Sequence, residues 1–263
     1  MQSFSEALNT KSKMPRVKKV TVGECPDCRN GLMPNGQPEP KRPLQKLVYE
    51  DGTEKLIPCV CSKEKEVNSI QKDLNAKKYI NASVIDIEYR NAQFDDLKIE
   101  TDQQAKAIEV AKDYIENFDD KLKNGRGLVI QGSFGTGKTY LSAIIRNALI
   151  KENYKVLFIK FADYFDMMVT TSKDTDGKTD GIYYMAKDAD LLILDEVNAE
   201  QNNWEAKELY KITDARMNKS TIYTTNYSSK DFKQSMKMNQ IFTRMMNRKD
   251  TIILNGKDYR IGG

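Results

Sequence analysis

The sequence predicts an α/β protein, with a parallel sheet covered by helices and a small cysteine-rich module in front of it. Two observations support this fold class. From Gly127 onward, short apolar segments alternate with segments of helical periodicity, which is typical of a parallel sheet with helices on both faces. All four cysteines lie within the first 61 residues, and the chain has no histidine, which excludes mixed Cys/His metal sites and histidine-based catalysis.

Length and composition set the outer limits. The 263 residues suffice for one α/β domain and a smaller module, and 30% charged residues beside 39% hydrophobic ones suit a soluble globular protein. No apolar run approaches the roughly 18 residues of a membrane span, and no signal-peptide pattern opens the chain. We therefore expect a cytoplasmic protein with no membrane partner. The net charge of +4 is too small to indicate a nucleic-acid partner by itself.

Residues 1–23 are expected to form a flexible basic tail. Its cations have few acids nearby: Lys11, Lys13, Arg16, Lys18 and Lys19. Most such arms are merely solvated, and a contact with phosphate groups is the alternative.

A zinc module is expected over residues 24–62. Its ligands would be two short cysteine motifs: Cys25 with Cys28, and Cys59 with Cys61. Between them, the Asp-Gly pair of Glu50-Asp-Gly-Thr53 predicts a hairpin turn that would bring the two motifs together. In a reducing cytosol, four thiolates favour a tetrahedral Zn²⁺ site over two disulfides. Free or redox-active thiols remain the alternative, because Cys-x-Cys is a less common zinc motif than Cys-x-x-Cys.

A helix and a linker are expected over residues 63–100. The helix is polar and ends at about Lys78, and the chain from Ile80 to Glu100 is expected to be extended. Thr101-Asp-Gln-Gln104 is a capping box that would begin an amphipathic helix running to about Leu122. The second domain is assigned to residues 101–263.

A phosphate-binding loop is the strongest motif in the chain. Residues 132–139, Gly-Ser-Phe-Gly-Thr-Gly-Lys-Thr, follow a predicted strand at 127–131 and precede a helix at 138–153. Such a loop aims backbone N–H groups and the positive end of the helix at a polyphosphate. Lys138 would reach the β- and γ-phosphates, and the Thr139 hydroxyl would bind Mg²⁺. The expected nucleotide contacts are Gly132, Ser133, Phe134, Gly135, Thr136, Gly137, Lys138, Thr139 and Tyr140.

Polar residues also end two later strands. Asp195 and Glu196 close an apolar strand at 191–195, and Asn226 closes a β-branched strand at 220–226. Because neighbouring strand residues point to opposite sides, the two acids should have different roles. We expect Asp195 to hold Mg²⁺ and Glu196 to polarise the attacking water, with Asn226 orienting that water. A further strand at 156–161, a helix from Ala162, a helix at 204–218 and a helix-rich tail complete the pattern.

The order of these motifs resembles AAA+ ATPases of the replicative helicase-loader group, the DnaC/DnaI type. The resemblance covers roughly residues 24–261 and includes the two cysteine motifs, the Phe-Thr-Arg-Met-Met stretch around Arg244 and the terminal Asp-Tyr-Arg260. It implies a P-loop AAA+ domain with a five-stranded parallel sheet. It also implies that Arg244 is an arginine finger inserted into a neighbouring subunit's site, with Arg248 as a competitor for that role. Arg260 would be the sensor-2 arginine, which contacts the γ-phosphate within its own subunit.

The resemblance further places a helical insertion between the strands at 156–161 and 191–195. In the related proteins such an insertion lines a channel for single-stranded DNA. The residues that could contact the DNA backbone or stack on bases are Lys173, Lys178, Tyr183, Tyr184 and Lys187. Aromatic side chains at helical spacing are more often part of the core, which is the alternative interpretation.

The function implied by the resemblance is loading of a replicative helicase hexamer onto single-stranded DNA. The loader would need ATP, Mg²⁺ and Zn²⁺ and would self-associate through its ATPase domain. An IstB-type transposition helper shares the core and is the closer alternative. A non-hydrolysing adaptor that uses ATP as a structural switch is another. DnaA-type initiators and clamp-loader subunits are disfavoured, because they carry a further domain after the ATPase and this sequence stops three residues past Arg260.

Overall fold

The computed structural model describes residues 17–25, 28, 41–57, 59–97, 99–171, 180–198 and 202–255. The chain divides into two compact units, Met1–Gln71 and Lys72–Gly263. We describe each unit by itself. The long helix α1 (Val60–Ala82) begins in the first unit and continues into the second.

The first unit contains an antiparallel sheet in the order β1-β2-β3. Its strands are β1 (Val17–Glu24), β2 (Pro43–Tyr49) and β3 (Glu54–Ile57). The predicted Asp-Gly turn joins β2 to β3: Gly52 has a φ of 81°, and the Asp51 carboxylate accepts a hydrogen bond from the Thr53 amide at 2.8 Å.

The flexible tail was wrongly extended to residue 23. Strand β1 starts at Val17 and pairs with β2 from Val17↔Tyr49 to Glu24↔Pro43. The strand signal is the recurrence of Val20 and Val22 at a spacing of two residues. It is easily overlooked because lysines fill the positions around these valines.

The second unit is a three-layered α/β domain built on a five-stranded parallel sheet in the order β5-β6-β7-β4-β8. The strands are β4 (Gly127–Gly132), β5 (Val156–Lys160), β6 (Leu191–Asp195), β7 (Thr221–Thr225) and β8 (Lys249–Leu254). The fold class and the five-stranded sheet predicted from the sequence are confirmed. The notable feature is the position of β7, which lies between the strand of the phosphate loop and the strand of the acids.

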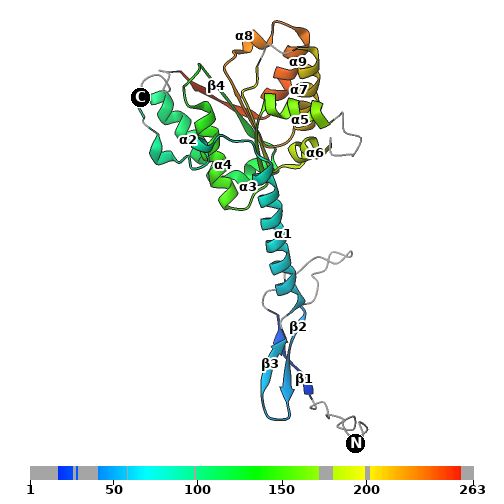
Figure 1. Cartoon of the computed structure of the whole chain (residues 1–263). Coiled ribbons are helices and arrows are strands. Elements are labelled where there is room, and N and C mark those ends of the chain that lie inside the picture. The colour runs from blue at the N-terminus through cyan, green and yellow to red at the C-terminus, as the bar shows by residue number, and fades with distance from the viewer. Residues whose placement is uncertain are drawn as a thin grey trace, which may run out of the picture. The chain divides into compact units, whose positions relative to one another are not determined.

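Helices cover both faces of this sheet (Figure 1). One face carries α2 (Asp102–Glu116), α3 (Phe118–Lys123) and α4 (Lys138–Lys151). The other carries α5 (Phe161–Thr171), α6 (Asp180–Asp188), α7 (Asn203–Ala215) and α9 (Met236–Met246), with the short α8 (Ser229–Phe232) before α9. Neighbouring strand residues pack into opposite layers, as Ile130 and Val129 do, so both faces of the sheet contribute side chains to the core.

The chain between α1 and α2 is not the expected extended linker. It forms two 3₁₀ turns, Ile87–Tyr89 and Phe94–Asp96, and buries Ile85 and Ala92 in the core. The Asn147 amide on α4 donates to the carbonyls of Tyr89 and Ala92 at 3.2 and 3.1 Å. Long-range packing of this kind leaves no periodic signal in the sequence, so the segment resembled a linker.

Two other boundaries differ from the prediction. The Thr101 capping box is present, but the helix that it begins is interrupted at Asn117, where α2 ends and α3 follows. The helix-rich tail was wrong in one respect, because residues 249–254 form strand β8 beside β4. This strand begins with Lys249 and Asp250, and only three of its residues are buried, so its sequence pattern is weak.

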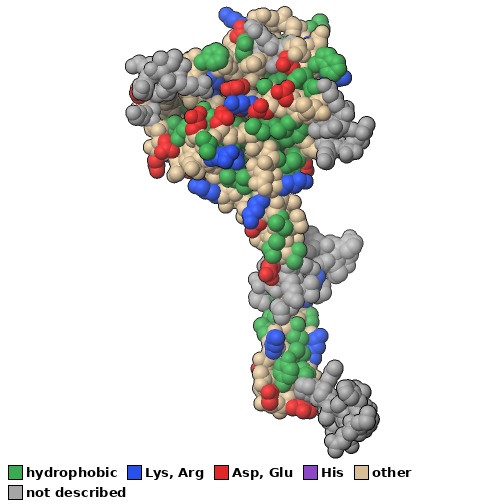
Figure 2. Space-filling model, in the orientation of Figure 1, with side chains coloured by type: hydrophobic (Ala, Val, Ile, Leu, Met, Phe, Trp, Pro, Cys, Tyr) green, Lys and Arg blue, Asp and Glu red, His purple; other side chains and the backbone are tan. Residues whose placement is uncertain are grey.

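No helix in the described part of the chain is both long enough and apolar enough to cross a membrane. On the face shown in Figure 2, acidic and basic side chains are interspersed over the second unit, and neither sign forms a large patch there.

Candidate nucleotide-binding site

The phosphate loop connects the end of β4 to the start of α4. Gly135 and Gly137 have φ values of 69° and 87°, a backbone conformation that glycine adopts without strain. At Gly132 a Cβ atom would lie 1.9 Å from the Leu254 carbonyl oxygen on β8, so only glycine fits. Helix α4 begins after Gly137 with no side-chain cap. The loop therefore turns tightly and directs the positive end of a helix at its own concave side.

Side chains of the loop bind back to it. The Thr136 hydroxyl donates to the Ser133 carbonyl at 2.9 Å, and the Lys138 ammonium group donates to the same oxygen at 2.6 Å. Lys138 is only 8% exposed, so its charge is held over the loop rather than in open solvent. A cation in this place suits the negative charge of a phosphate.

The Asp195 carboxylate, at the end of β6, is fully buried and contacts the phosphate loop directly. It accepts hydrogen bonds from the Thr139 hydroxyl at 3.1 and 3.2 Å and from the Thr224 hydroxyl at 2.5 Å. Burial raises the pKa of Asp195 above its usual value, and the nearby Glu196 adds to the rise. A hydroxyl and a carboxylate oxygen are hard donors that suit Mg²⁺, so Thr139 and Asp195 fit the metal predicted for them.

Glu196 has a different environment from Asp195. Its side chain is exposed, its φ is 57°, and its backbone amide donates to the Thr224 hydroxyl at 2.9 Å. The left-handed backbone turns the chain at the end of β6, so the second carboxylate leaves the core and lines a pocket. The two acids therefore have different surroundings, and the roles expected for them stay predictions.

One pocket brings together residues of the phosphate loop, the end of β6 and the end of β7. It is lined by Phe134, Gly135, Lys138, Thr139, Glu196, Thr224, Thr225 and Asn226. Asn226 follows β7, as expected, and is partly buried. Phe134 is 69% exposed at the rim. Tyr140 is not among the lining residues, because its hydroxyl group donates to the Asp96 carboxylate at 2.8 Å outside the pocket.

Thr224 is a site residue that the sequence reasoning missed. Its hydroxyl bonds both the Asp195 carboxylate and the Glu196 amide, and its carbonyl accepts from the Val197 amide at 2.9 Å. Through these bonds, β7 fixes the end of β6. The sequence does carry a signal, since a polar Thr-Thr pair ends an otherwise buried strand. That signal becomes specific only when the strand order is known.

The structure brings three of the four cysteines together in the first unit. The sulfur atoms of Cys25, Cys28 and Cys59 all lie within 4.8 Å of one another, and those of Cys28 and Cys59 are 3.6 Å apart. In a tetrahedral zinc-thiolate site, neighbouring sulfurs are about 3.8 Å apart, given Zn–S bonds of about 2.3 Å. The three thiols therefore fit zinc. The side chain of Cys61 lies outside the described residues.

Arg244 and Arg248 are not among the residues that line the pocket. Arg244, in the last turn of α9, donates to the Asp214 carboxylate at 2.8 Å and to the Tyr210 hydroxyl at 2.6 Å, both on α7. Arg248 donates to the Asn124 carbonyl at 3.2 Å. Arg260 lies outside the described residues. In the part of the chain that the structure describes, Lys138 is the only cation lining the pocket.

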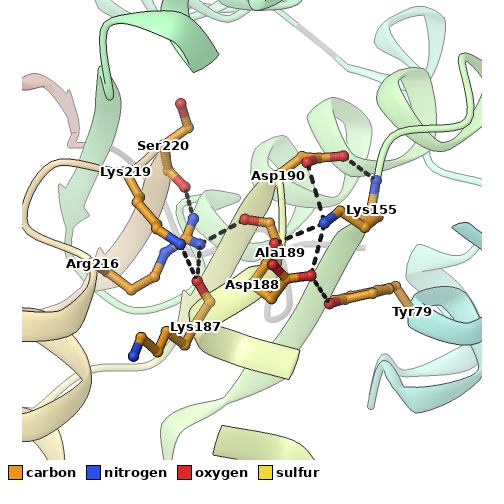
Figure 3. A network of polar contacts seen from close by, with 9 residues as sticks. All are labelled: Tyr79, Lys155, Lys187, Asp188, Ala189, Asp190, Arg216, Lys219 and Ser220. Atoms are coloured by element: carbon orange, nitrogen blue, oxygen red, sulfur yellow. Dashed lines mark hydrogen bonds and ion pairs between the residues drawn. The ribbon is translucent and has the colours of Figure 1, made fainter. Parts of the chain in front are cut away.

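The predicted DNA-contacting residues have mixed surroundings. Lys173 and Lys178 lie outside the described residues. The Tyr183 ring is half-buried, and the Lys211 ammonium group lies 4.4 Å from its centroid, which supports the packing alternative. Tyr184 is 56% exposed. The Lys187 side chain is exposed, while its carbonyl oxygen accepts from Arg216 and Lys219 (Figure 3).

Comparisons with known proteins identify the family of this chain. A family model described as IstB-like ATP binding protein matches residues 48–261. The replicative helicase loader DnaC of Buchnera aphidicola subsp. Acyrthosiphon pisum (strain APS) is 30% identical over 149 residues, which cover 55% of this chain and 59% of that protein. The aligned segment is thus less than two thirds of the relative's length.

Two solved structures share the fold. A crystal structure of DnaI aligns with a TM-score of 0.55 and 26% identity, over 67% of this chain and 94% of that chain. A crystal structure of the DnaC helicase loader aligns with a TM-score of 0.57 and 24% identity, over 64% of this chain and 99% of that chain. Because the family model matches most of the chain, including the phosphate loop and the acidic strand, the protein belongs to the IstB-like family of ATP-binding proteins, which includes the DnaC type.

Proposed function

We propose that this protein is an ATP-dependent loader of a ring-shaped replicative helicase onto single-stranded DNA. The observation that carries the proposal is the contact between Thr139 and Asp195, which joins the phosphate loop to the acidic strand at the carboxyl edge of the sheet. The names of the DnaC relatives and of the DnaI structure support the loading role.

The positions of the pocket residues support a mechanism of ATP hydrolysis, in which each residue has the role predicted for it. Lys138 and the backbone of the loop would hold the phosphates, and Thr139 and Asp195 would hold Mg²⁺, which would supply positive charge beside the phosphates. Glu196 accepts a proton from water as the water oxygen bonds to the γ-phosphorus. The bond from that phosphorus to the β–γ bridging oxygen breaks, and ADP and phosphate leave. Asn226, on the neighbouring strand, orients the water.

The site is completed by a second copy of the chain. The transition state of phosphoryl transfer gains negative charge, which an arginine stabilises. Arg244 does not line its own pocket, and we assign it to the pocket of the adjoining subunit, with Arg248 as the competitor. Arg260 would contact the γ-phosphate in its own subunit. ATP binding therefore favours the assembled state, and hydrolysis favours release.

The other parts of the chain take the partners. The first unit, with zinc on Cys25, Cys28, Cys59 and Cys61, would bind the helicase hexamer. The α5–α6 insertion would contact single-stranded DNA, and the exposed ring of Tyr184 is the best stacking surface in its described part.

Transposition is the second candidate, because the matching family model is described by IstB. The two functions differ in the partner and not in the ATP site. Co-purification from the native host decides between them: a replicative helicase supports loading, and a transposase contradicts it.

Cys59→Ser should abolish capture of the helicase while ATP hydrolysis persists. Capture that survives would place the binding surface outside the zinc module.

The ATPase step is tested by steady-state hydrolysis with and without single-stranded DNA. We expect Lys138→Ala to lose ATP binding. Glu196→Gln should bind ATP normally and hydrolyse it at least about tenfold more slowly, because the base is lost and the phosphate contacts remain. Glu88→Gln is the matched control, since Glu88 is an exposed acid away from the pocket. Normal turnover in Glu196→Gln removes that residue from the base role. Nucleotide binding without turnover in the wild type favours the non-hydrolysing adaptor.

A further inference from the structure

The guanidinium group of Arg244 is held by groups from two helices. Its Nε donates to the Asp214 carboxylate at 2.8 Å, and one terminal nitrogen donates to the Tyr210 hydroxyl at 2.6 Å. The other terminal nitrogen donates to the Gln240 carbonyl, one turn earlier on α9, at 3.1 Å. The guanidinium carbon also lies 4.2 Å from the centroid of the Tyr210 ring, within the range of a cation–π contact.

These contacts leave part of the guanidinium available. An arginine has five N–H donors, and the described hydrogen bonds engage three of them. Two N–H groups on the terminal nitrogens remain, which is the number needed to bind two oxygens of one phosphate. The side chain is 23% exposed, so it is oriented by its neighbours and still reaches the surface.

An ordinary surface ion pair explains this arrangement less well. Such pairs contribute little to stability and leave the side chain mobile. Here two hydrogen bonds and a ring contact from α7, together with one carbonyl from α9, fix both the position and the plane of the guanidinium. The side chain of Arg248, by contrast, is exposed and forms one described hydrogen bond.

We propose that Asp214 and Tyr210 are positioning residues for Arg244, holding its guanidinium so that the two remaining N–H groups are ready for the γ-phosphate bound by an adjoining copy. The inference rests on the proposed ATPase function. A cation that is already oriented stabilises the transition state without paying for reorganisation at the moment of reaction. We call Asp214 and Tyr210 together the cradle of Arg244. Loss of the cradle should therefore lower kcat and leave the KM for ATP unchanged, because the nucleotide is bound by the other subunit's loop.

Steady-state hydrolysis by full-length variants tests the proposal. We expect Asp214→Ala to lower kcat about fivefold to tenfold with no change in KM, which corresponds to about 1.0–1.4 kcal/mol of transition-state stabilisation. Asp214→Asn keeps an acceptor oxygen in the same place and should stay within about twofold of the wild type. Tyr210→Phe keeps the ring but loses the hydroxyl, so an intermediate effect of about threefold is expected.

Repeating the substitution in an Arg244→Ala protein separates a positioning role from a general loss of folding or activity. If Asp214 acts through Arg244, Asp214→Ala should have no further effect on kcat in an Arg244→Ala protein. Asp113→Ala is the matched control, because Asp113 also forms a 2.8 Å ion pair and is similarly exposed, 56% against 53% for Asp214, but lies on α2. The control should leave kcat unchanged.

The outcomes distinguish the positioning role of Asp214 and Tyr210 from the proposed ATPase function. Normal turnover in Arg244→Ala shows that Arg244 is not the arginine finger, and it also overturns the cradle. A large loss in Arg244→Ala with normal turnover in Asp214→Ala overturns the cradle alone. The cradle is also contradicted if Asp214→Ala lowers kcat equally in both backgrounds.

Discussion

The two edges of the parallel sheet both bury charge, but the partners of that charge differ. At the carboxyl edge, the buried Asp195 accepts hydrogen bonds from two hydroxyl groups, those of Thr139 and Thr224. At the amino edge, the buried Arg216 donates to three backbone carbonyls, those of Lys187, Ala189 and Ser220 (Figure 3). It also donates to the Thr221 hydroxyl.

The partners decide what each charge can do. Backbone carbonyls cannot rotate away, so Arg216 is fixed and ties the end of α6 to β6 and β7. Hydroxyl groups rotate easily, so the oxygens of Asp195 can exchange them for a metal ion. Two buried ionic groups at opposite ends of one sheet thus serve different purposes, and the one with exchangeable partners lies beside the described pocket.

A polar network around Arg216 extends its structural role. The Lys155 ammonium group donates to the Asp188 carboxylate at 2.8 Å, and that carboxylate also accepts from the Tyr79 hydroxyl at 3.1 Å (Figure 3). Within the second unit, these bonds connect the end of α1 to α6 and β5. These side chains hold the amino edge together, and none of them was predicted to be a site residue.

The largest effect on stability should come from removing Arg216. We expect Arg216→Ala to lower the free energy of unfolding of the second unit by about 3–5 kcal/mol, because several buried carbonyls lose their donor. Urea unfolding measures this loss. Arg216→Lys should recover part of it. A loss below about 1 kcal/mol would show that water replaces the guanidinium and would weaken the contrast between the edges.

A smaller effect is expected at Lys249, a second buried cation at the amino edge. Its ammonium group donates to the Asn247 carbonyl at 2.9 Å, and burial, followed by the charges of Arg216 and Arg248, lowers its pKa to about 8. Because the folded state binds this proton less tightly than the unfolded chain does, the wild type gains stability as the pH rises from about 8 to 10.5.

Replacing Lys249 by Met should therefore stabilise the protein at pH 7, by an amount on the order of 2 kcal/mol. This advantage should shrink as the pH rises through the same window. Urea unfolding at pH 7 and at about pH 10 compares the two proteins. A difference that stays constant between the two pH values would contradict the buried-charge explanation.

The smallest effect on stability is expected at Asp195, whose hydrogen-bond partners can be exchanged. Asp195→Asn keeps an oxygen for the Thr224 hydroxyl and removes a buried negative charge, so we expect it to stabilise the nucleotide-free protein by about 1 kcal/mol. The same change should abolish Mg²⁺-dependent hydrolysis. Thermal unfolding without nucleotide measures the gain. A lower melting temperature would mean that Asp195 is as structural as Arg216.

Motifs whose residues are adjacent in the sequence could be predicted. The phosphate loop, the Asp195–Glu196 pair and the Asn226 strand end all lie at the expected edge, because βα alternation fixes which ends of the strands meet. The Asp-Gly turn was likewise a local signal. These features depend on a few neighbouring residues and on general rules of chain topology.

Features that depend on distant parts of the chain were missed. Strand β8 is specified mainly by its pairing with β4, and the segment around Ile85 and Ala92 by its packing against the core. Thr224 becomes a site residue only because β7 lies between β4 and β6. The cradle of Arg244 joins residues 30 and 34 positions apart. The short-range patterns of these features are absent or too weak to identify them without the fold.

The central claim, a magnesium–ATP site completed by a neighbouring copy, is tested most directly by hydrolysis in an equimolar mixture of Arg244→Ala and Glu196→Gln. Each variant alone should be nearly inactive. In the mixture, intact pockets on the first should meet intact arginines on the second, which restores about one quarter of wild-type turnover if neighbours assort at random. Activity that stays at the average of the two separate variants would contradict a site shared between subunits.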